Sequence, residues 1–178
     1  KMRRRYTREW YLDRVARIRQ AMPDCAITTD IIAGFCGETG QDHQATLDIM
    51  RRVKYDYAYM FQYSERPGTL AARKYPDDIE PQEKTRRLNE IIALQNELSL
   101  ESNKKDVGKV LTVLVEGTSK RSDKELCGRA SNNKMCVFPA ELAEASEPTA
   151  PGRYHVGDYV KVEVLSCTSA TLICKIAE

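Results

Sequence analysis

The sequence predicts an α/β unit followed by a small all-β barrel, and three observations lead to this prediction. Two short apolar runs, 26–33 and 57–62, are separated by a helical pattern, and the loop that follows each contains glycine. A longer helical pattern covers residues 81–104. Beyond it the chain consists of short β-prone runs divided by turn residues, so the boundary is placed between residues 105 and 106.

Helices and strands alternate in the first part of the chain. Thr7 is the expected N-cap of a helix that ends before Pro23. The strand at 26–33 comes next, followed by a helix whose N-cap Thr39 has Asp42 at the third position, as in a capping box. The order of helix, strand, helix and strand predicts a parallel unit with right-handed crossovers.

Residues 67–78 contain two prolines and are predicted to be irregular. Pro81 then occupies a position that the first turn of a helix tolerates. Leucines and isoleucines form one broad face of the helix that follows. Its charged residues are expected to keep the other side in water: Glu83, Lys84, Arg86 and Arg87.

Five β-prone runs in the second part predict a closed or nearly closed antiparallel barrel of the oligonucleotide-binding type. They are Val107–Glu116, Leu126–Ala130, Lys134–Phe138, Tyr159–Ser166 and Thr171–Ile176. Glu141–Gly152 is acidic and contains proline, and is expected to be an exposed loop.

The composition is that of a globular protein, with 42% hydrophobic and 30% charged residues. A net charge of +2 excludes a nonspecific polycation. The basic residues near the start, from Lys1 to Arg8, form either a solvated surface or a phosphate-binding patch. No run has the length of a membrane span and no signal peptide is recognisable, so a cytoplasmic location is expected.

Six cysteines raise the question of a metal site. No two of them form a Cys-x-x-Cys pair, and His43 and His155 are far in sequence from any cysteine pair. We therefore predict no metal site in this chain. Cys136, Cys167 and Cys174 lie in apolar strand patterns, where cysteine acts as a small hydrophobic residue.

Four stretches carry a resemblance to a known family. TDIIAGF at 29–35 with GET at 37–39, and YSERPGT at 63–69, resemble the ends of the fifth and sixth strands of a radical S-adenosylmethionine (radical SAM) half-barrel. Residues 94–117 resemble the hinge that leads into a TRAM domain. CGRASNNKMCVFP at 127–139 resembles the pattern typical of the tRNA methylthiotransferases, although Cys36 and Cys127 replace the family's usual proline and serine.

The resemblance implies the C-terminal part of a radical SAM half-barrel, 1–105, followed by a small five-stranded TRAM (OB-like) β-barrel, 106–178. It implies a transferase that adds a methylthio group to C2 of N6-isopentenyladenosine beside the tRNA anticodon. The cofactors would be S-adenosylmethionine and two 4Fe-4S clusters. The family's Cys-x-x-x-Cys-x-x-Cys run does not occur here, so the cluster ligands are expected upstream of Lys1, and this fragment alone is expected to be inactive and without catalytic residues.

The expected partners are the tRNA anticodon arm and the upstream portion of the same polypeptide, with no membrane and no DNA. Two alternatives stay open. A ribosomal-protein methylthiotransferase keeps the chemistry but changes the substrate, and a freestanding RNA-binding module has no catalysis. The protein sequence that precedes Lys1 would distinguish the enzyme from the module.

By resemblance, the residues expected near S-adenosylmethionine are Asp30, Gly34, Phe35, Gly37, Glu38 and Arg66. The glycines would let the backbone approach the cofactor closely. Asp30 would need a ribose hydroxyl, a basic side chain or an internal salt bridge. Glu38 could instead stabilise the start of its own helix. Arg66 could bind the cofactor carboxylate, an RNA phosphate or an internal partner.

The aromatic residues Tyr59, Phe61 and Tyr63 alternate along a strand and suggest either barrel core or a base-stacking surface. In the barrel, the expected RNA-binding residues are Lys120, Arg121, Lys124, Arg129, Asn133 and Lys134, with solvated surface as the alternative for each lysine. Phe138 is the aromatic residue closest to them in sequence, and it either stacks on a base or belongs to the core.

Overall fold

The computed structural model describes residues 1–140 and 154–177, which belong to two compact units, Lys1–Ser99 and Leu100–Glu178. The division falls within helix α4 (Pro81–Lys104), slightly before the boundary predicted between residues 105 and 106. The loop predicted over Glu141–Gly152 lies outside the described residues.

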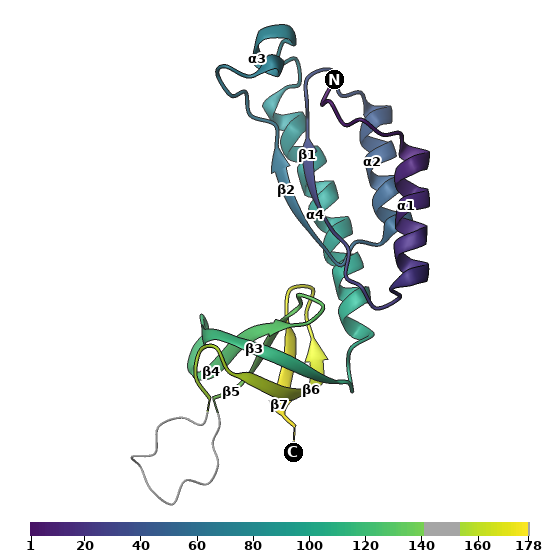
Figure 1. Cartoon of the computed structure of the whole chain (residues 1–178). Coiled ribbons are helices and arrows are strands. Elements are labelled where there is room, and N and C mark those ends of the chain that lie inside the picture. The colour runs from purple at the N-terminus through teal and green to yellow at the C-terminus, as the bar shows by residue number, and fades with distance from the viewer. Residues whose placement is uncertain (141–153, 178) are drawn as a thin grey trace, which may run out of the picture. The chain divides into compact units, whose positions relative to one another are not determined.

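The first unit has the predicted order of helices and strands (Figure 1). Its elements are α1 (Arg8–Ala21), β1 (Thr28–Ala33), α2 (Gly40–Val53), β2 (Tyr57–Gln62), α3 (Leu70–Lys74) and most of α4. Strands β1 and β2 pair in parallel, with Thr28 opposite Tyr57 and Ala33 opposite Gln62. The predicted parallel α/β unit is confirmed to this extent, while its membership of a radical SAM half-barrel stays a proposal.

The helix starts follow the capping chemistry of the sequence. The Thr7 hydroxyl accepts a hydrogen bond from the Trp10 N–H. Thr39 and Asp42 form a full capping box, because each side chain accepts a hydrogen bond from the backbone N–H of the other residue. Helix α3 lies in the stretch predicted to be irregular; it is five residues long and is capped by Thr69. So short a helix has no apolar period from which it could be predicted.

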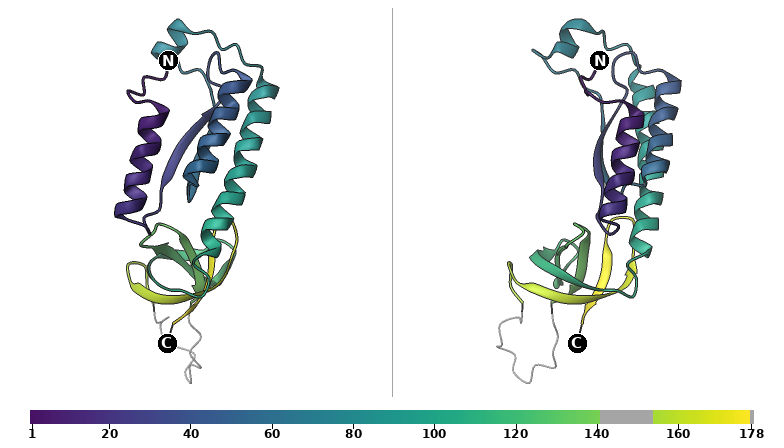
Figure 2. Two further views of the ribbon diagram at one scale, coloured as in Figure 1. Left: turned by 90° about the vertical axis from the view of Figure 1, so that its right-hand side faces the viewer. Right: turned by 45° about the vertical axis from the view of Figure 1, so that its right-hand side comes forward.

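Helices α1, α2 and α4 cover one face of the two-stranded sheet (Figure 2). Ala33, Met50 and Ile91 belong to that core and are at most 1% exposed. The opposite face of the sheet is open, with Tyr59 55% and Phe61 53% exposed. The described residues therefore do not bury these two aromatic rings in a barrel core.

The expectation for the charged side of α4 is wrong at two positions. Lys84 is 6% exposed and Arg87 is 5% exposed, so neither keeps the helix surface in water. Each has an acidic partner, Asp77 for Lys84 and Glu38 for Arg87. Because these partners lie in loops outside α4, the helical pattern alone gives no sign of the burial.

The second unit contains the predicted five-stranded closed barrel (Figure 1). Its strands are β3 (Val110–Ser119), β4 (Ser122–Ala130), β5 (Met135–Pro139), β6 (Tyr159–Cys167) and β7 (Leu172–Ile176). Their order around the barrel is β3, β4, β5, β7 and β6, and β6 pairs again with β3. All neighbouring pairs are antiparallel except β5 and β7, which are parallel.

Alternate side chains of the strands fill the barrel. Val113, Val162 and Leu172 are fully buried, and Phe138 is 1% exposed. The packing role predicted for cysteine is confirmed for Cys136 and Cys174, which belong to this core, and Cys167 packs partly buried against it. Within residues 1–140 and 154–177 no three metal-ligating side chains form a cluster, and no helix is long and apolar enough to cross a membrane.

One glycine allows β3 and β4 to approach each other closely. Gly128 is buried, and a Cβ atom at this position would lie 2.0 Å from the carbonyl oxygen of Leu114 and 2.8 Å from Val113 Cγ1. The first contact is to backbone, which no side-chain rotation can relieve. Only glycine therefore fits this crossing without a shift of the two strands.

Candidate functional site

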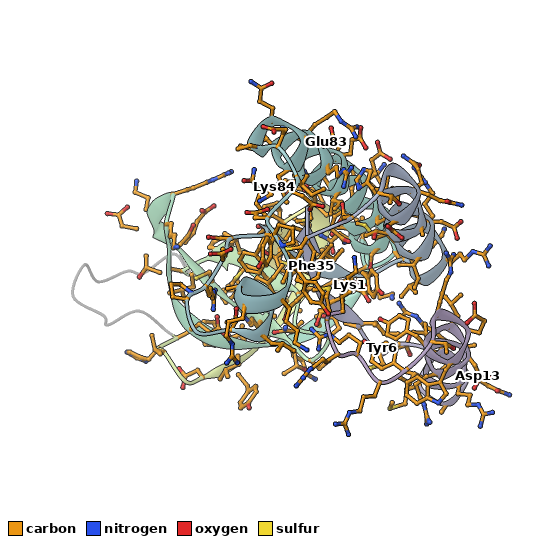
Figure 3. All side chains as sticks on the ribbon, turned by 90° about the horizontal axis from the view of Figure 1, so that it is seen from above. Lys1, Tyr6, Asp13, Phe35, Glu83 and Lys84 are labelled. Carbon is orange, nitrogen blue, oxygen red and sulfur yellow. The ribbon has the colours of Figure 1, made fainter. Side chains whose placement is uncertain are left out.

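The loop after β1 depends on two glycines. Gly34 and Gly37 have φ angles of 75° and 73°, which side chains of L-residues disfavour. A Cβ atom at Gly34 would lie 2.4 Å from Cγ of Lys84, near the start of α4. Figure 3 looks down on this end of the unit and labels Phe35 and Lys84 among its side chains. The space left by the missing Cβ of Gly34 is therefore occupied by the Lys84 side chain, where the sequence predicts the cofactor.

Glu38 holds this loop against α4. Its carboxylate accepts the Gly34 N–H at 3.0 Å and Arg87 Nη1 at 2.8 Å. Arg87 Nη1 also donates to the Glu38 carbonyl oxygen at 2.8 Å. Both side chains are nearly buried, with 13% of Glu38 and 7% of Arg87 exposed. The carboxylate is engaged by the protein, so Glu38 shapes the loop.

Aromatic rings and a second ion pair complete this end of the unit. Lys84 Nζ lies 2.6 Å from both carboxylate oxygens of Asp77 and 5.4 Å from the centre of the Tyr63 ring. The Phe35 ring meets Tyr63 edge-on, with 5.1 Å between centroids. The neighbouring Cys36 thiol raises the pKa of Tyr63 from its ordinary value near 10 to about 12.

The remaining predicted cofactor residues lie apart from this loop. Asp30 is exposed on the open face of the sheet and lines a pocket of about 260 Å³ together with Arg4 and Ile32. The described residues provide no salt bridge for Asp30. Arg66 is exposed in the loop after β2, and no described side chain pairs with its guanidinium. The structure thus brings together Gly34, Phe35, Gly37 and Glu38, and leaves Asp30 and Arg66 as polar groups available to a ligand.

In the barrel, three predicted RNA-binding cations surround the β3–β4 turn. Lys120 and Arg121 form its tip and Lys124 follows in β4; all three are exposed. The Ser119 hydroxyl accepts the Arg121 N–H at 3.3 Å, which orders the turn. Within the described chain, none of the three cationic groups has an ion-pair partner. They are therefore available to phosphates.

Arg129 lies on the outer surface of the barrel but is partly engaged. Its Nη1 donates to the Asn133 carbonyl oxygen at 3.0 Å, and its Nε lies 3.4 Å from Glu116 Oε1. Asn133 has a φ of 61°, a left-handed conformation that asparagine tolerates better than most residues. The Arg129 side chain remains 41% exposed. Asn133 thus positions Arg129, and the guanidinium keeps open edges.

Lys134 is held inside the second unit. Its Nζ lies 2.7 Å from Asp106 Oδ2 and 3.0 Å from the Ser102 carbonyl oxygen, and only 11% of the side chain is exposed. Asp106 is 7% exposed and also accepts from Lys109 at 2.8 Å. Burial raises the pKa of Asp106, but the two lysines outweigh burial and the pKa is lowered. This geometry argues for a structural role of Lys134 and against a phosphate contact.

Sequence reasoning missed the roles of two residues of the second unit, for different reasons. Asp106 has no distinctive motif around it, so its role depends on the fold. The sequence predicts only that Tyr159 lies in a strand, yet its side chain is 73% exposed, whereas Phe138 is in the core. Successive side chains of a strand point to opposite faces, and Val160 and Val162 are apolar and buried. This alternation is the sequence signal that predicts Tyr159 on the outer surface of the barrel.

The model of the TRAM domain family matches residues 104–176, which include the whole barrel. These residues form a TRAM domain. The match confirms the predicted identity of the second unit, and it begins at the end of α4.

Proteins of one name match almost the whole chain. The tRNA-2-methylthio-N(6)-dimethylallyladenosine synthase of Phocaeicola vulgatus is 52% identical over 171 residues, which is 96% of this chain and 35% of that protein. The synthase of Porphyromonas gingivalis is 50% identical over 177 residues, 99% of this chain and 36% of that protein. The synthase of Chlorobium phaeobacteroides is 51% identical over 172 residues, 97% of this chain and 36% of that protein.

The chain is therefore a homologue of one part of these synthases, and the predicted relationship to the tRNA methylthiotransferases is confirmed. It spans roughly a third of the length of the relatives that it matches. The TRAM domain accounts for only residues 104–176, so the similarity extends through the helix–strand unit as well.

Proposed function

We propose that this chain is the C-terminal part of a tRNA methylthiotransferase that adds a methylthio group to C2 of N6-isopentenyladenosine beside the anticodon. The observation that supports this most strongly is the identity of about half of all residues over nearly the whole chain to synthases of that name. The CGRASNNKMCVFP segment at 127–139 favours a tRNA over a ribosomal protein as the substrate.

The first unit is proposed to be the C-terminal portion of a radical SAM core. The open face of its sheet, with Ile32, Tyr59 and Phe61 exposed, is suited to cover by the upstream portion of the same polypeptide. When bound, S-adenosylmethionine and the two iron–sulfur clusters would supply the radical, methyl and sulfur chemistry. The clusters are proposed to bind upstream, because no described side chains form a metal-ligating group.

Three side chains of the first unit are proposed to contact S-adenosylmethionine. Arg66 offers a guanidinium for the cofactor carboxylate, Asp30 offers a carboxylate for hydroxyls or an amine, and Phe35 offers a half-buried aromatic ring. Gly34, Gly37 and Glu38 act indirectly in this proposal, since they hold the loop on which Phe35 lies. Arg87 and Lys84 belong to the same support.

The TRAM domain is proposed to hold the anticodon arm through the β3–β4 turn. Lys120, Arg121 and Lys124 are exposed and have no ion-pair partner among the described residues, so their charge is available to RNA. Arg129 adds a guanidinium on the barrel surface. Asn133 and Glu116 engage some of its N–H groups, and only the remaining ones are available to RNA. Lys134 is assigned to the fold.

The enzymatic proposal is tested in the organism that encodes the chain. Deletion of its gene should remove the 2-methylthio group from tRNA, leaving N6-isopentenyladenosine in the nucleosides identified by mass spectrometry. Restoring the gene should restore the modified nucleoside. Unchanged tRNA together with loss of a methylthio group from a ribosomal protein would favour the ribosomal-protein enzyme. No change in either would favour the RNA-binding module.

The RNA-binding proposal is tested by titrating salt. Each phosphate contact to a single strand contributes about −0.7 to the slope of log affinity against log salt concentration. Substituting Lys120, Arg121 or Lys124 by alanine should therefore weaken binding to an anticodon stem-loop. It should also flatten the slope by about 0.7 for each phosphate interaction that the substitution removes.

Arg52→Ala is the control, because Arg52 is an exposed cation on α2 that pairs with Asp48 at 2.9 Å. It removes the same charge from a helix that does not belong to the barrel. Equal effects of Arg52→Ala and the turn variants would show that net charge alone attracts the RNA and would contradict the proposed contact.

A further inference from the structure

Tyr159 is the most exposed large hydrophobic side chain in the described part of the chain, at 73%. It begins β6 and pairs with Leu114 of β3, which pairs on its other side with Arg129 of β4. The register therefore places Tyr159, Leu114 and Arg129 in one row across three strands. Residues directly opposite in a sheet lie on the same face.

This row lies on the outside of the barrel. In the adjacent register row Val113 pairs with both Val160 and Ala130, and these three residues belong to the barrel core. Because successive residues of a strand point to opposite faces, the row of Tyr159 points outward. Leu114 is half-buried between its neighbours and is not a member of the core. The outer surface thus presents an aromatic ring next to an aliphatic side chain.

The charges around Tyr159 favour an anionic partner. Lys161, the next outward residue of β6, is exposed and has no ion-pair partner among the described residues. Three acidic residues lie nearby, and each has a partner. Asp158, directly before Tyr159, accepts the His155 N–H at 2.7 Å, Glu163 pairs with Lys175 at 2.9 Å, and Glu116 pairs with Arg129 at 3.4 Å. A ring with an available cation two residues away suits a nucleotide, because bases stack on aromatic rings while cations contact the phosphates.

We propose that Tyr159 is a base-stacking site for single-stranded RNA and that Lys161 contacts the adjoining phosphate. The inference rests on the proposed function, since it requires the TRAM domain to bind RNA. It extends the binding surface beyond the β3–β4 turn, across β3 to β6.

The test compares two oligoribonucleotides of equal length, one of uridines and one with abasic residues, bound to the whole chain. Stacking of one base on an aromatic side chain corresponds to about a 5- to 150-fold change in affinity. Tyr159→Ala should lose about that factor on the uridine strand and little on the abasic strand. Tyr159→Phe should keep the affinity of the unchanged protein for both.

Lys161→Ala distinguishes charge from stacking. It should weaken both strands alike and flatten the salt slope by about 0.7, whereas Tyr159→Ala should leave the slope unchanged. The stacking inference is overturned if Tyr159→Ala binds both strands with the affinity of the unchanged protein, or if it loses the same affinity for both. The exposed ring would then be assigned to contact with a protein partner. If the unchanged protein binds neither strand nor an anticodon stem-loop, the proposed RNA binding fails as well.

Discussion

Gly128→Ala is expected to destabilise the TRAM domain by about 2–3 kcal/mol. The added Cβ would lie 2.0 Å from the Leu114 carbonyl oxygen, far inside contact distance. Since the obstacle is backbone, β3 and β4 must move apart where Val115 pairs with Gly128, and the neighbouring register pairs are disturbed with them. Urea titration followed by the NMR signals of barrel amides would measure the effect on this unit alone.

Gly117→Ala is the matched control for this substitution. Gly117 lies in the same pair of strands, opposite Cys127, and a Cβ atom there would meet nothing within 4 Å. The control should change the free energy of unfolding by less than about 1 kcal/mol. Similar losses of stability for the two variants would mean that glycine flexibility, and not the close crossing at Gly128, determines the result.

Lys134→Ala is expected to destabilise the same unit by about 3 kcal/mol. It removes one partner of an ion pair whose side chains are 11% and 7% exposed, and leaves the Asp106 carboxylate with less compensation for its burial. Lys109→Ala is the control, because Lys109 contacts the same carboxylate while its own side chain is 53% exposed. Water solvates the half-exposed Lys109 ammonium group and Lys134 still compensates the carboxylate, so this variant should lose at most about 1 kcal/mol.

The pH dependence of unfolding provides a second measurement of this ion pair. The pKa of Asp106 is lowered in the folded protein, so its contribution is present above the ordinary pKa near 4 and is lost as the pH falls through the folded value. Lys134→Ala should reduce this acid-side loss of stability. An unchanged acid profile in Lys134→Ala would indicate that the ion pair contributes little, and would leave Lys134 available for RNA binding.

The candidate sites could be predicted only in part, and the reason differs from residue to residue. Lys120, Arg121 and Lys124 follow from local sequence, because a basic turn between two strands is exposed in almost any barrel. Lys134 has the same local appearance, yet Asp106 and the Ser102 carbonyl bury it. The role of Lys134 is decided by its partner Asp106, which lies 28 positions away in the sequence.

Periodicity and capping determined the elements of this chain. The alternation of short apolar runs with helical patterns predicted the order of α1, β1, α2 and β2, and Thr39 with Asp42 marked the start of α2. Turn residues separated the five strands of the barrel. These features are local, since each depends on residues within one or two turns of the backbone. The family resemblance also belongs to the sequence, because it depends on residues in order.

Only the tertiary structure decided which charged side chains are buried in ion pairs and which side chains remain exposed to a ligand. It placed Lys84 and Arg87 against Asp77 and Glu38, gave Gly34 and Gly128 their close neighbours, and aligned Tyr159 with Leu114 and Arg129 on the outer surface. Each of these contacts joins residues that lie in different elements. Their free energies depend on distance and burial, which a linear pattern of residue types does not contain.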